Sequence, residues 1–420
     1  MTAQIIKRAS LITWPVWILA GALAIRFLAQ VAYGLYSSPE TFEFDQIARN
    51  IITGHGYSYP FFESEWQTFG FPAFPMILAL LHALGGGPNA YWLIGIALAV
   101  ASAALVWVAY SIATHLFDRT AGLVAAVLTT LNPPLLLYAA RVHELNLDAL
   151  LAGAILIAVL DQARSRSLSG LRLGILSGIA MLARPTVVAF AAASLGALAL
   201  RAPRRPLVAA AAIMLAVALP WSVRNAAVLG TLSPTVPYNC VHLWKGNNPN
   251  ATGGAITADG RSVYEVMPDD LRARLLGKPE IEQGRIFCEE AFQFLRSAPL
   301  SGLLWFAEKF VYFWWFPPHA GLLYPKGWID AYRILWAMEG ALVLVGGAAV
   351  WRRGSRAAFG IVALQLLIIS ASQSVGFVEG RHRLLLEPTL SALAAVGIVS
   401  LARLVPLRRL RRSSRAGTPS

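Results

Sequence analysis

Residues 89–113 read NAYWLIGIALAVASAALVWVAYSIA, a run of 25 residues without one charged side chain. About 20 mostly apolar residues are needed to cross the ~30 Å hydrocarbon layer of a bilayer. Of the 420 residues in the chain, 57% are hydrophobic and only 14% are charged, whereas a soluble domain carries about 25% charged residues. The composition therefore excludes a soluble globular enzyme and a disordered chain. It indicates a protein whose solvent is lipid.

Nine further runs are apolar enough to span a membrane, or nearly so. Together with the first run they predict ten spans, at about residues 11–33, 89–113, 121–140, 145–161, 168–183, 185–200, 207–223, 331–351, 357–376 and 385–404. The N-terminal run, residues 11–33, lacks the cleavage pattern of a signal peptide, so we expect it to remain as a span. Two other apolar runs are ambiguous. Residues 71–84 extend only ~21 Å as a helix, and residues 300–317 carry Glu308 and Lys309 in their middle.

The two ambiguous runs either both cross the membrane or both lie on its outer surface. The distribution of Lys and Arg decides between these two topologies, because cytoplasmic loops carry an excess of positive charge. If both ambiguous runs lie on the outer surface without crossing, the inside segments hold 18 Lys/Arg and 2 Asp/Glu, and the outside segments hold 15 and 19. If both runs cross, the basic loops near residues 119, 164–172 and 201–205 move outside. We therefore predict an all-α, multi-pass protein of the plasma membrane, with ten spans, interfacial helices on the outer face and both termini in the cytoplasm.

This topology predicts three parts. Residues 1–223 form an N-terminal membrane module that includes the first outer loop, 34–88. Residues 224–330 form a second outer region with an interfacial helix, and residues 331–420 form the last spans and a basic cytoplasmic tail. We interpret that tail as an anchor on anionic lipid rather than a site for nucleic acid. Function is expected in the outer loops, because loops held by a rigid scaffold usually carry the chemistry.

The first outer loop contains a short helix with a carboxylate near its start. Phe44, Ile47 and Ile51 share one face, Asp45 lies elsewhere, and the glycines at 54 and 56 end the helix. Two interpretations of Asp45 remain open. It is either an exposed acid that favours the helix dipole, or a catalytic carboxylate held just above the bilayer.

Several motifs along the chain resemble the GT-C glycosyltransferases, and more closely the group of dolichyl-phosphate-mannose-protein mannosyltransferases and aminoarabinose transferases. They are FDQIARNIITGHGYS (44–58), FGFPAFPMILAL (69–80), MLARPTVVA (181–189), PWSVRNAAVLGTLSPT (220–235), NCVHLWKGNNPNATGG (239–254) and EGRHRLLLEP (379–388). The resemblance implies a membrane enzyme that transfers a sugar from a polyprenyl-phosphate donor, on the outer face, to a glycan, lipid or protein acceptor. The sequence departs from the group at Gly70, where relatives usually carry Arg or Lys.

The resemblance also implies roles for two acids. Asp45 matches the first-loop aspartate, which would act as a base or bind a divalent metal. Glu144, in the stretch Arg141-Val142-His143-Glu144, matches the second acid and is the other candidate metal ligand, although it could simply pair with Arg141. A zinc motif of the HExxH type is excluded, because residue 147 is leucine. Asp148, Arg26 and Glu339 lie inside predicted spans, where charge requires a role or a partner.

A lipid phosphate needs cations, and arginine binds phosphate well through its planar fork. The resemblance favours Arg381 and Arg383, with His382 between them, helped by Lys245 or Arg184. Arg224 is a further candidate, and Asn247 belongs to the GNNP element, for which a structural turn is a serious alternative. Cys240 and Cys288 both lie in the second outer region and could pair in an oxidising compartment.

Neither a Walker-type loop nor a G-x-G-x-x-G motif is present, so we expect no nucleotide cofactor. The alternative function is a non-enzymatic carrier of lipid-linked glycans. A carrier is expected to show repeats or broken helices and charges near the middle of the membrane.

Overall fold

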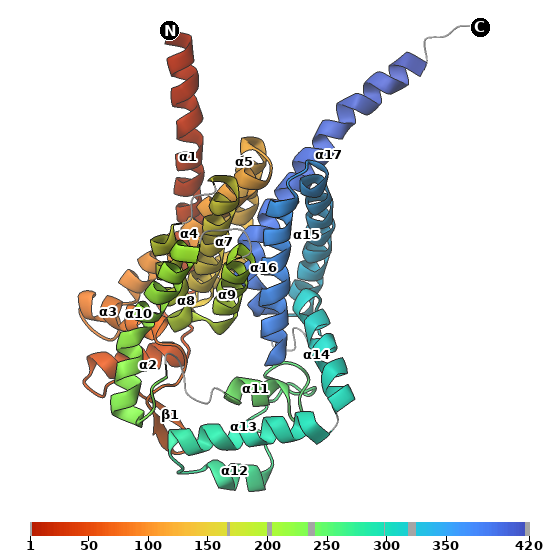
Figure 1. The fold of residues 1–420 in the computed structure, drawn as a ribbon. Coiled ribbons are helices and arrows are strands. Elements are labelled where there is room, and N and C mark those ends of the chain that lie inside the picture. Colours follow the sequence, from red (N-terminus) through yellow and green to blue (C-terminus); the bar gives the residue numbers. More distant parts are fainter. Residues whose placement is uncertain are drawn as a thin grey trace.

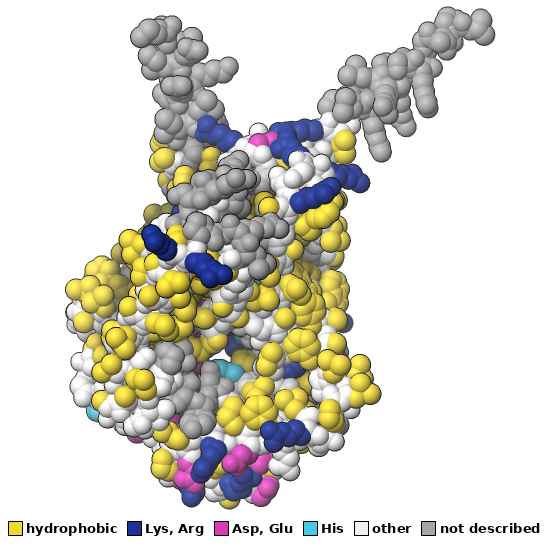
Figure 2. Space-filling model, in the orientation of Figure 1, with side chains coloured by type: hydrophobic (Ala, Val, Ile, Leu, Met, Phe, Trp, Pro, Cys, Tyr) yellow, Lys and Arg dark blue, Asp and Glu magenta, His cyan; other side chains and the backbone are white. Residues whose placement is uncertain are grey.

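The computed structural model describes residues 2–165, 169–199, 204–233, 240–297, 299–317 and 325–415, with side chains between residues 16 and 404. Its helices form a bundle, from one end of which α1 and α17 project, while a small outer subdomain closes the other end (Figure 1). Both termini lie at the same end of the bundle (Figure 1). Hydrophobic side chains cover much of the middle of the molecule, and acidic and basic side chains mix at the end that carries the subdomain (Figure 2).

All ten predicted spans coincide with helical segments. These are α1 (Thr2–Ala32), α4 (Tyr91–Leu116), α5 (Arg119–Leu131) followed by α6 (Pro133–Ala139), α7 (Leu145–Ser165), α8 (Gly170–Ala183), α9 (Pro185–Ala199), α10 (Arg204–Leu229), α15 (Lys326–Arg352), α16 (Arg356–Val375) and α17 (Glu387–Arg415). Six helices of the described part of the chain are long and apolar enough to cross a membrane, and the bent pair α5–α6 would be a seventh. Helices α8 and α9 are shorter than the ~30 Å hydrocarbon layer requires.

The predicted span 121–140 is broken near its outer end. Helices α5 and α6 meet at 54°, and the side chain of Asn132 caps α6 by accepting a hydrogen bond from the Leu135 N–H at 3.1 Å. The break leaves backbone carbonyls of α5 without helical partners. Arg26 donates to the carbonyls of Thr129 and Thr130, each at 3.3 Å. The buried charge of Arg26 therefore stabilises the C-terminal end of α5, where a cation is favoured by the helix dipole.

Helices α3 (Ala73–Leu84) and α14 (Pro299–Trp314) match the two ambiguous runs. Each buries one face in the protein and leaves apolar side chains exposed on the other: Met76, Ile77, Leu80 and Leu84 on α3, and Leu300, Leu303, Leu304 and Val311 on α14. Exposed apolar stripes of this kind are expected where a helix meets lipid.

The outer subdomain is built from both outer loops. The first loop contributes a hairpin of β1 (Tyr59–Phe61) and β2 (Ser64–Trp66), which pair antiparallel. The second contributes α11 (Cys240–Gly246), α12 (Asp269–Leu275) and α13 (Glu280–Ser297). The hairpin corrects the prediction of a purely helical protein. Two non-glycine residues, Phe62 and Glu63, form its turn with positive φ, so the sequence carried no glycine signal for it.

The hairpin and α13 interlock through buried polar contacts. Trp66 Nε1 donates to Gln283 Oε1 at 2.6 Å, and the Glu280 carboxylate accepts the backbone N–H groups of Gln67 and Thr68 at 2.7 and 3.1 Å. Aromatic and aliphatic side chains from both loops form one core, including Trp66, Trp244 and Phe287. The first outer loop and the described residues 240–297 therefore share one hydrophobic core.

Cys240 and Cys288 form a disulfide that joins α11 to α13 across a sequence separation of 48 residues. Disulfides persist in oxidising compartments and are rare in the cytosol. The pairing agrees with an extracytoplasmic position for this end of the molecule.

Candidate active site

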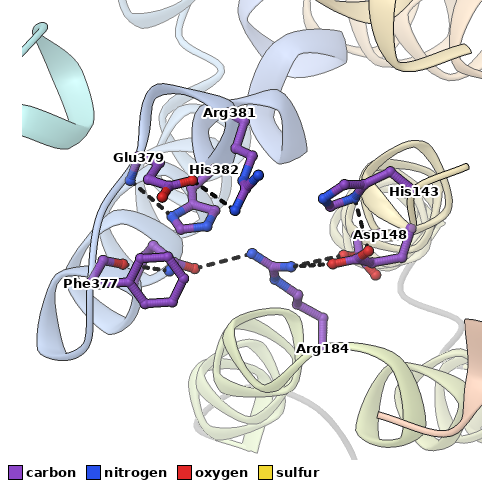
Figure 3. Close-up of polar contacts among 9 residues, drawn as sticks. His143, Asp148, Arg184, Phe377, Glu379, Arg381 and His382 are labelled. Atoms are coloured by element: carbon purple, nitrogen blue, oxygen red, sulfur yellow. Dashed lines mark hydrogen bonds and ion pairs between the residues drawn. The ribbon is translucent and has the colours of Figure 1, made fainter. Parts of the chain in front are cut away.

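Predicted site residues from four separate parts of the chain meet where the bundle adjoins the outer subdomain. They come from the α6–α7 connection, the α8–α9 connection, α11 and the 3-10 helix η1 (Gly380–Leu386). Figure 2 shows a hollow at this level, with a histidine side chain at its edge. In the close-up, the Arg184 guanidinium lies between Asp148 and His143 on one side and the Phe377–His382 segment on the other (Figure 3).

Arg184 is the central cation of the site. It precedes Pro185 and is therefore held in an extended conformation at the end of α8. Its Nη1 donates to Glu144 Oε1 at 3.1 Å and to Asp148 Oδ2 at 3.3 Å, and its Nη2 donates to Gln373 Oε1 at 3.5 Å. Arg184 thus pairs with the second predicted acid, and Asp148, which the sequence left unassigned, belongs to the same network.

Glu144 is held in its ionised form. Burial raises the pKa of Glu144, but the neighbouring His143 and the Arg184 guanidinium outweigh burial and lower the pKa to about 2. His143 Nδ1 lies 2.8 Å from Glu144 Oε2, close enough for an ion pair, although the two atoms do not make a hydrogen bond. The His143 ring packs edge-on against Phe42 and Tyr138, with centroids 4.8 and 5.3 Å away. The suggested pairing of Glu144 with Arg141 is wrong, because Arg141 Nε pairs with Glu40 at 2.7 Å.

Arg381 extends from η1 near Arg184 (Figure 3) and is only partly covered, with 31% of its side chain exposed. Its Nη2 pairs with Glu379 Oε2 at 2.7 Å, and its Nε is buried without a hydrogen-bonding partner among the described residues. Glu379 and His382 cap the first turn of η1 reciprocally. The His382 Nδ1 accepts from the Glu379 N–H at 3.1 Å, which assigns the ring proton to Nε2.

Helix α11 contributes Lys245 and His242 to the same group of side chains. Lys245 Nζ lies 5.0 Å from the ring centroid of Tyr264 and 5.2 Å from that of Phe377. Burial lowers the pKa of Lys245, and Glu43 and Glu379 oppose that effect. His242 stacks on Phe377 with centroids 5.4 Å apart. Burial, and then the cations around it, lower the pKa of His242 to about 3, so it is neutral at physiological pH.

Glu43, in the first outer loop, lies within electrostatic reach of these cations. It interacts electrostatically with both Lys245 and Arg381, and no described residue forms a hydrogen bond or ion pair with its carboxylate. It begins α2 (Glu43–Ile52), two residues before Asp45. Because a helix turns by about 100° per residue, side chains two positions apart point in nearly opposite directions. The two-residue spacing therefore indicates, from the sequence alone, that Glu43 and Asp45 cannot both face the site.

Asp45 points into the protein, and its predicted role as a base or metal ligand stays a prediction. The side chain is fully buried and accepts hydrogen bonds from Tyr91 OH and Arg49, while His82 Nε2 lies 2.9 Å from its Oδ1. Burial raises the pKa of Asp45, but the bonds from His82, Arg49 and Tyr91 lower it below the usual value. Asp45 therefore joins α2 to α3 and α4, and it has no free oxygen for an acceptor hydroxyl.

Asp45→Asn should act on stability rather than selectively on chemistry. Losing charge-assisted hydrogen bonds in a buried site costs about 1–3 kcal/mol, so the thermal unfolding midpoint should fall and donor binding should weaken together with transfer. Thermal unfolding measured beside transfer checks this. The matched control is Asp259→Asn, at an exposed aspartate, which should leave both unchanged. Complete loss of transfer with an unchanged midpoint would contradict the structural role.

A metal shared by Asp45 and Glu144 does not fit this arrangement. The oxygens of Asp45 are bound by Arg49, His82 and Tyr91, and Glu144 is held by Arg184 and His143. In the described part of the chain no group of three or more His, Cys, Asp or Glu side chains could hold a metal ion.

Arg383 does not reach the hollow, which corrects its predicted role as a phosphate ligand. It is 1% exposed, it donates to the carbonyls of Phe313 and Trp314, and its Nη2 donates to Tyr332 OH at 3.0 Å. Its guanidinium carbon lies 3.6 Å from the ring centroid of Trp336. Arg383 therefore anchors η1 between α14 and α15.

Arg224 and Asn247 also make structural contacts. Arg224 donates to the carbonyl of Gln67 at 2.7 Å and lies over the Trp221 ring, which holds the first outer loop against α10. Asn247 is buried, donates to the carbonyl of Val375 at 3.0 Å and accepts from Lys309 at 2.8 Å. The GNNP element is thus a structural joint beside the site.

Comparisons with known proteins bear on the family and the fold. Residues 70–223 match the family model of the dolichyl-phosphate-mannose-protein mannosyltransferases. No curated protein matches the chain. Two structures of an oligosaccharyltransferase from Archaeoglobus fulgidus share its fold. The apo form has a TM-score of 0.55 at 14% identity, covering 97% of this chain and 53% of that one. The form tethered to an acceptor peptide has a TM-score of 0.53 at 14% identity, covering 94% and 50%.

The chain thus spans about half the length of the archaeal enzyme. ArnT from Cupriavidus metallidurans, solved with undecaprenyl phosphate, is also similar, at 14% identity and with 92% of this chain and 77% of that chain covered. Its TM-score of 0.41 is too low to support an argument about the fold. The family match over residues 70–223 confirms, for that part of the chain, the resemblance predicted from the sequence motifs.

Proposed function

We propose that the chain transfers a sugar from a polyprenyl-phosphate donor to a glycan, lipid or protein acceptor on the extracytoplasmic side of the plasma membrane. One observation carries the proposal. Three cations from different parts of the fold, Arg184, Lys245 and Arg381, lie within electrostatic reach of His242, and the carboxylates of Glu43 and Glu144 act on the same group of charges. Cations and carboxylates that meet at the membrane surface suit a reaction in which a lipid phosphate leaves and a hydroxyl attacks.

The cations would bind the donor phosphate. When the bond between the anomeric carbon and the phosphate oxygen breaks, negative charge develops on that oxygen, and fixed cations stabilise it most effectively in a site that excludes water. Arg381 is best suited to this role because it is partly exposed and its buried Nε has no described partner. Lys245 adds a second positive charge from α11. Arg184 pairs with Glu144 and Asp148, so it would act on the phosphate mainly through its positive charge rather than through hydrogen bonds of its own.

Glu43 would act as the base. A carboxylate with a pKa near 2, such as that of Glu144, is a weak proton acceptor, and Glu144 therefore serves to hold Arg184 in place. Glu43 takes the proton as the acceptor oxygen bonds to the anomeric carbon, and the polyprenyl phosphate leaves with the electron pair. A single in-line displacement of this kind inverts the configuration at the anomeric carbon.

The proposed topology has ten spans with both termini in the cytoplasm. An even number of crossings agrees with the position of both termini at one end of the bundle (Figure 1). The disulfide at the opposite end supports an oxidising environment there. The short helices α8 and α9 would cross by packing among longer neighbours rather than facing lipid along their whole length.

Glu43→Gln tests the proposal in proteoliposomes supplied with a panel of labelled polyprenyl-phosphate sugars. Removal of a general base lowers the rate by about 10²–10⁴-fold, and donor binding should be retained because glutamine keeps the shape of the side chain. Glu65→Gln, on the exposed face of β2, is the matched control.

Two outcomes would contradict the proposal. Unchanged transfer by Glu43→Gln removes Glu43 from the mechanism. If the wild type moves labelled donor across the bilayer and transfers no sugar from it, the carrier function is favoured instead.

A further inference from the structure

Lys309 on α14 is a buried cation outside the proposed phosphate site. It is 1% exposed, and no described acidic side chain contacts it. Its Nζ donates to Asn247 Oδ1 and to the Gly376 carbonyl, each at 2.8 Å, and to the Val375 carbonyl at 3.2 Å. The Gly246 carbonyl lies 3.4 Å away. A buried ammonium without an anion is costly, and lysine is almost never fully buried without a partner.

Two of these oxygens belong to the C-terminal end of α16. That helix ends at Val375, and its last carbonyls have no helical partners. Lys309 caps them and interacts favourably with the negative end of the helix dipole. The other two oxygens belong to the Gly246–Asn247 turn that follows α11. Lys309 therefore joins α14, α16 and α11 at one point.

The turn and the end of α16 touch at their backbones. A Cβ on Gly246 would lie 2.1 Å from the Gly376 carbonyl oxygen, so no larger residue fits there. Trp305 Nε1 also donates to the Gly246 carbonyl, at 2.7 Å. The contact is tight, and Lys309 binds both partners of it.

The residues next to this contact are the proposed phosphate ligands. Lys245 directly precedes Gly246, and Arg381 follows Gly376 by five residues. A shift between the two segments would change the separation of the two cations. We propose that Lys309 is a positioning residue, which sets the spacing of Lys245 and Arg381 and so the affinity of the site for a lipid phosphate. This inference rests on the proposed function, because it assumes that these two cations bind phosphate.

The positioning depends on the charge of Lys309. Burial alone lowers the pKa of Lys309 to about 7. None of the described charged groups contributes to that lowering, neither Glu308 and Arg296 on α14 and α13 nor Lys245, Glu379, Arg381 and Arg383 on α11 and around η1. Above pH 7 the ammonium loses its proton and holds the four oxygens less strongly, so phosphate binding should weaken.

Stability should change in the opposite direction. Because the folded-state pKa of Lys309 is below the unfolded value of 10.5, the unfolded chain binds more protons between pH 7 and 10.5. The contribution of Lys309 to the free energy of unfolding therefore rises with pH in this window. Weaker phosphate binding over the same range could not be attributed to unfolding through this group.

The experiment measures the dissociation constant of undecaprenyl phosphate in lipid nanodiscs at pH 6 and pH 8.5, with thermal unfolding in parallel. The wild type is compared with Lys309→Met and Lys309→Gln. The pKa of Lys245 is also lowered by burial, but Lys245 is present in all three proteins, so the ratio of their affinities isolates Lys309. Lys278→Met is the matched control, since Lys278 is exposed and pairs with Glu282 at 3.2 Å.

We expect Lys309→Met to bind at least tenfold more weakly than the wild type at pH 6, and the ratio to approach one at pH 8.5. Lys309→Gln should show the same change in affinity as Lys309→Met. It can replace Lys309→Met in the comparison if that variant does not fold. An affinity ratio near one at pH 6, or one that does not change with pH, overturns the positioning role. If Arg381→Ala abolishes binding in the same assay while the Lys309 variants do not, the proposed function stands and this inference fails. If the wild type does not bind the lipid, the proposed function fails.

Discussion

Arg381→Ala should lower glycosyl transfer by about 10²–10³-fold, the loss expected when one preorganised donor to a developing oxyanion is removed. Arg381 approaches the hollow from η1, and its Nε has no described partner, so the substitution removes a donor without breaking a folded network. Only Glu379 loses its ion pair, and its carboxylate is 25% exposed to solvent. The measurement is initial transfer rate in proteoliposomes, with thermal unfolding to confirm the fold.

Two further variants sharpen this prediction. Arg381→Lys keeps the charge but loses the planar fork, so it should recover only part of the activity. Arg261→Ala, at an exposed arginine that pairs with Asp259, should leave transfer unchanged. Wild-type rates in Arg381→Ala would mean that the phosphate binds elsewhere.

Arg184→Met should have the largest effect on stability, a loss of about 3–5 kcal/mol, because it leaves the Glu144 and Asp148 carboxylates buried without their shared cation. It should also change the acid dependence. The pKa of Glu144 is lowered from 4.5 to about 2 in the folded protein, so its contribution to stability is present above pH 4.5 and is lost as the pH falls toward 2. In the variant this loss should be smaller. Unfolding midpoints measured across that range check both effects.

The double variant Arg184→Met with Glu144→Gln provides the control. Removing both charges of a buried pair is less damaging than removing one, so the second substitution should restore part of the lost stability. A double variant less stable than Arg184→Met alone would show that Glu144 is not destabilised by the missing cation.

The membrane helices could be predicted because lipid imposes a simple requirement on length and polarity. The break between α5 and α6 could not be predicted from hydropathy, because the residues that stabilise it are distant in the sequence. Arg26 binds the freed carbonyls, and Asn132 Nδ2 donates to Glu387. Hydropathy does not record such contacts. The two outer-face helices were predicted from charge, and their exposed stripes agree with that interpretation.

The site was predicted less completely because orientation on a helix depends on packing. Asp45 and Glu43 are two residues apart, and the sequence alone did not show which of them faces the cations. His82 and Tyr91 determine the answer by binding Asp45 from α3 and α4. Arg381 and Arg383 present the same problem on η1, where the aromatic side chains around Arg383 bury one guanidinium and leave the other accessible.

The interlock of the hairpin with α13 has a consequence for biogenesis. Trp66 and its partner Gln283 are separated by 217 residues, and six of the proposed crossings lie between Asn89 and Leu229. At about 5–20 residues per second, the ribosome would need roughly 10–40 s to synthesise the intervening chain. During that interval the hairpin lacks the helix that completes its core. A nascent chain halted before residue 283 would therefore leave Phe61 and Trp66 without the partners that bury them.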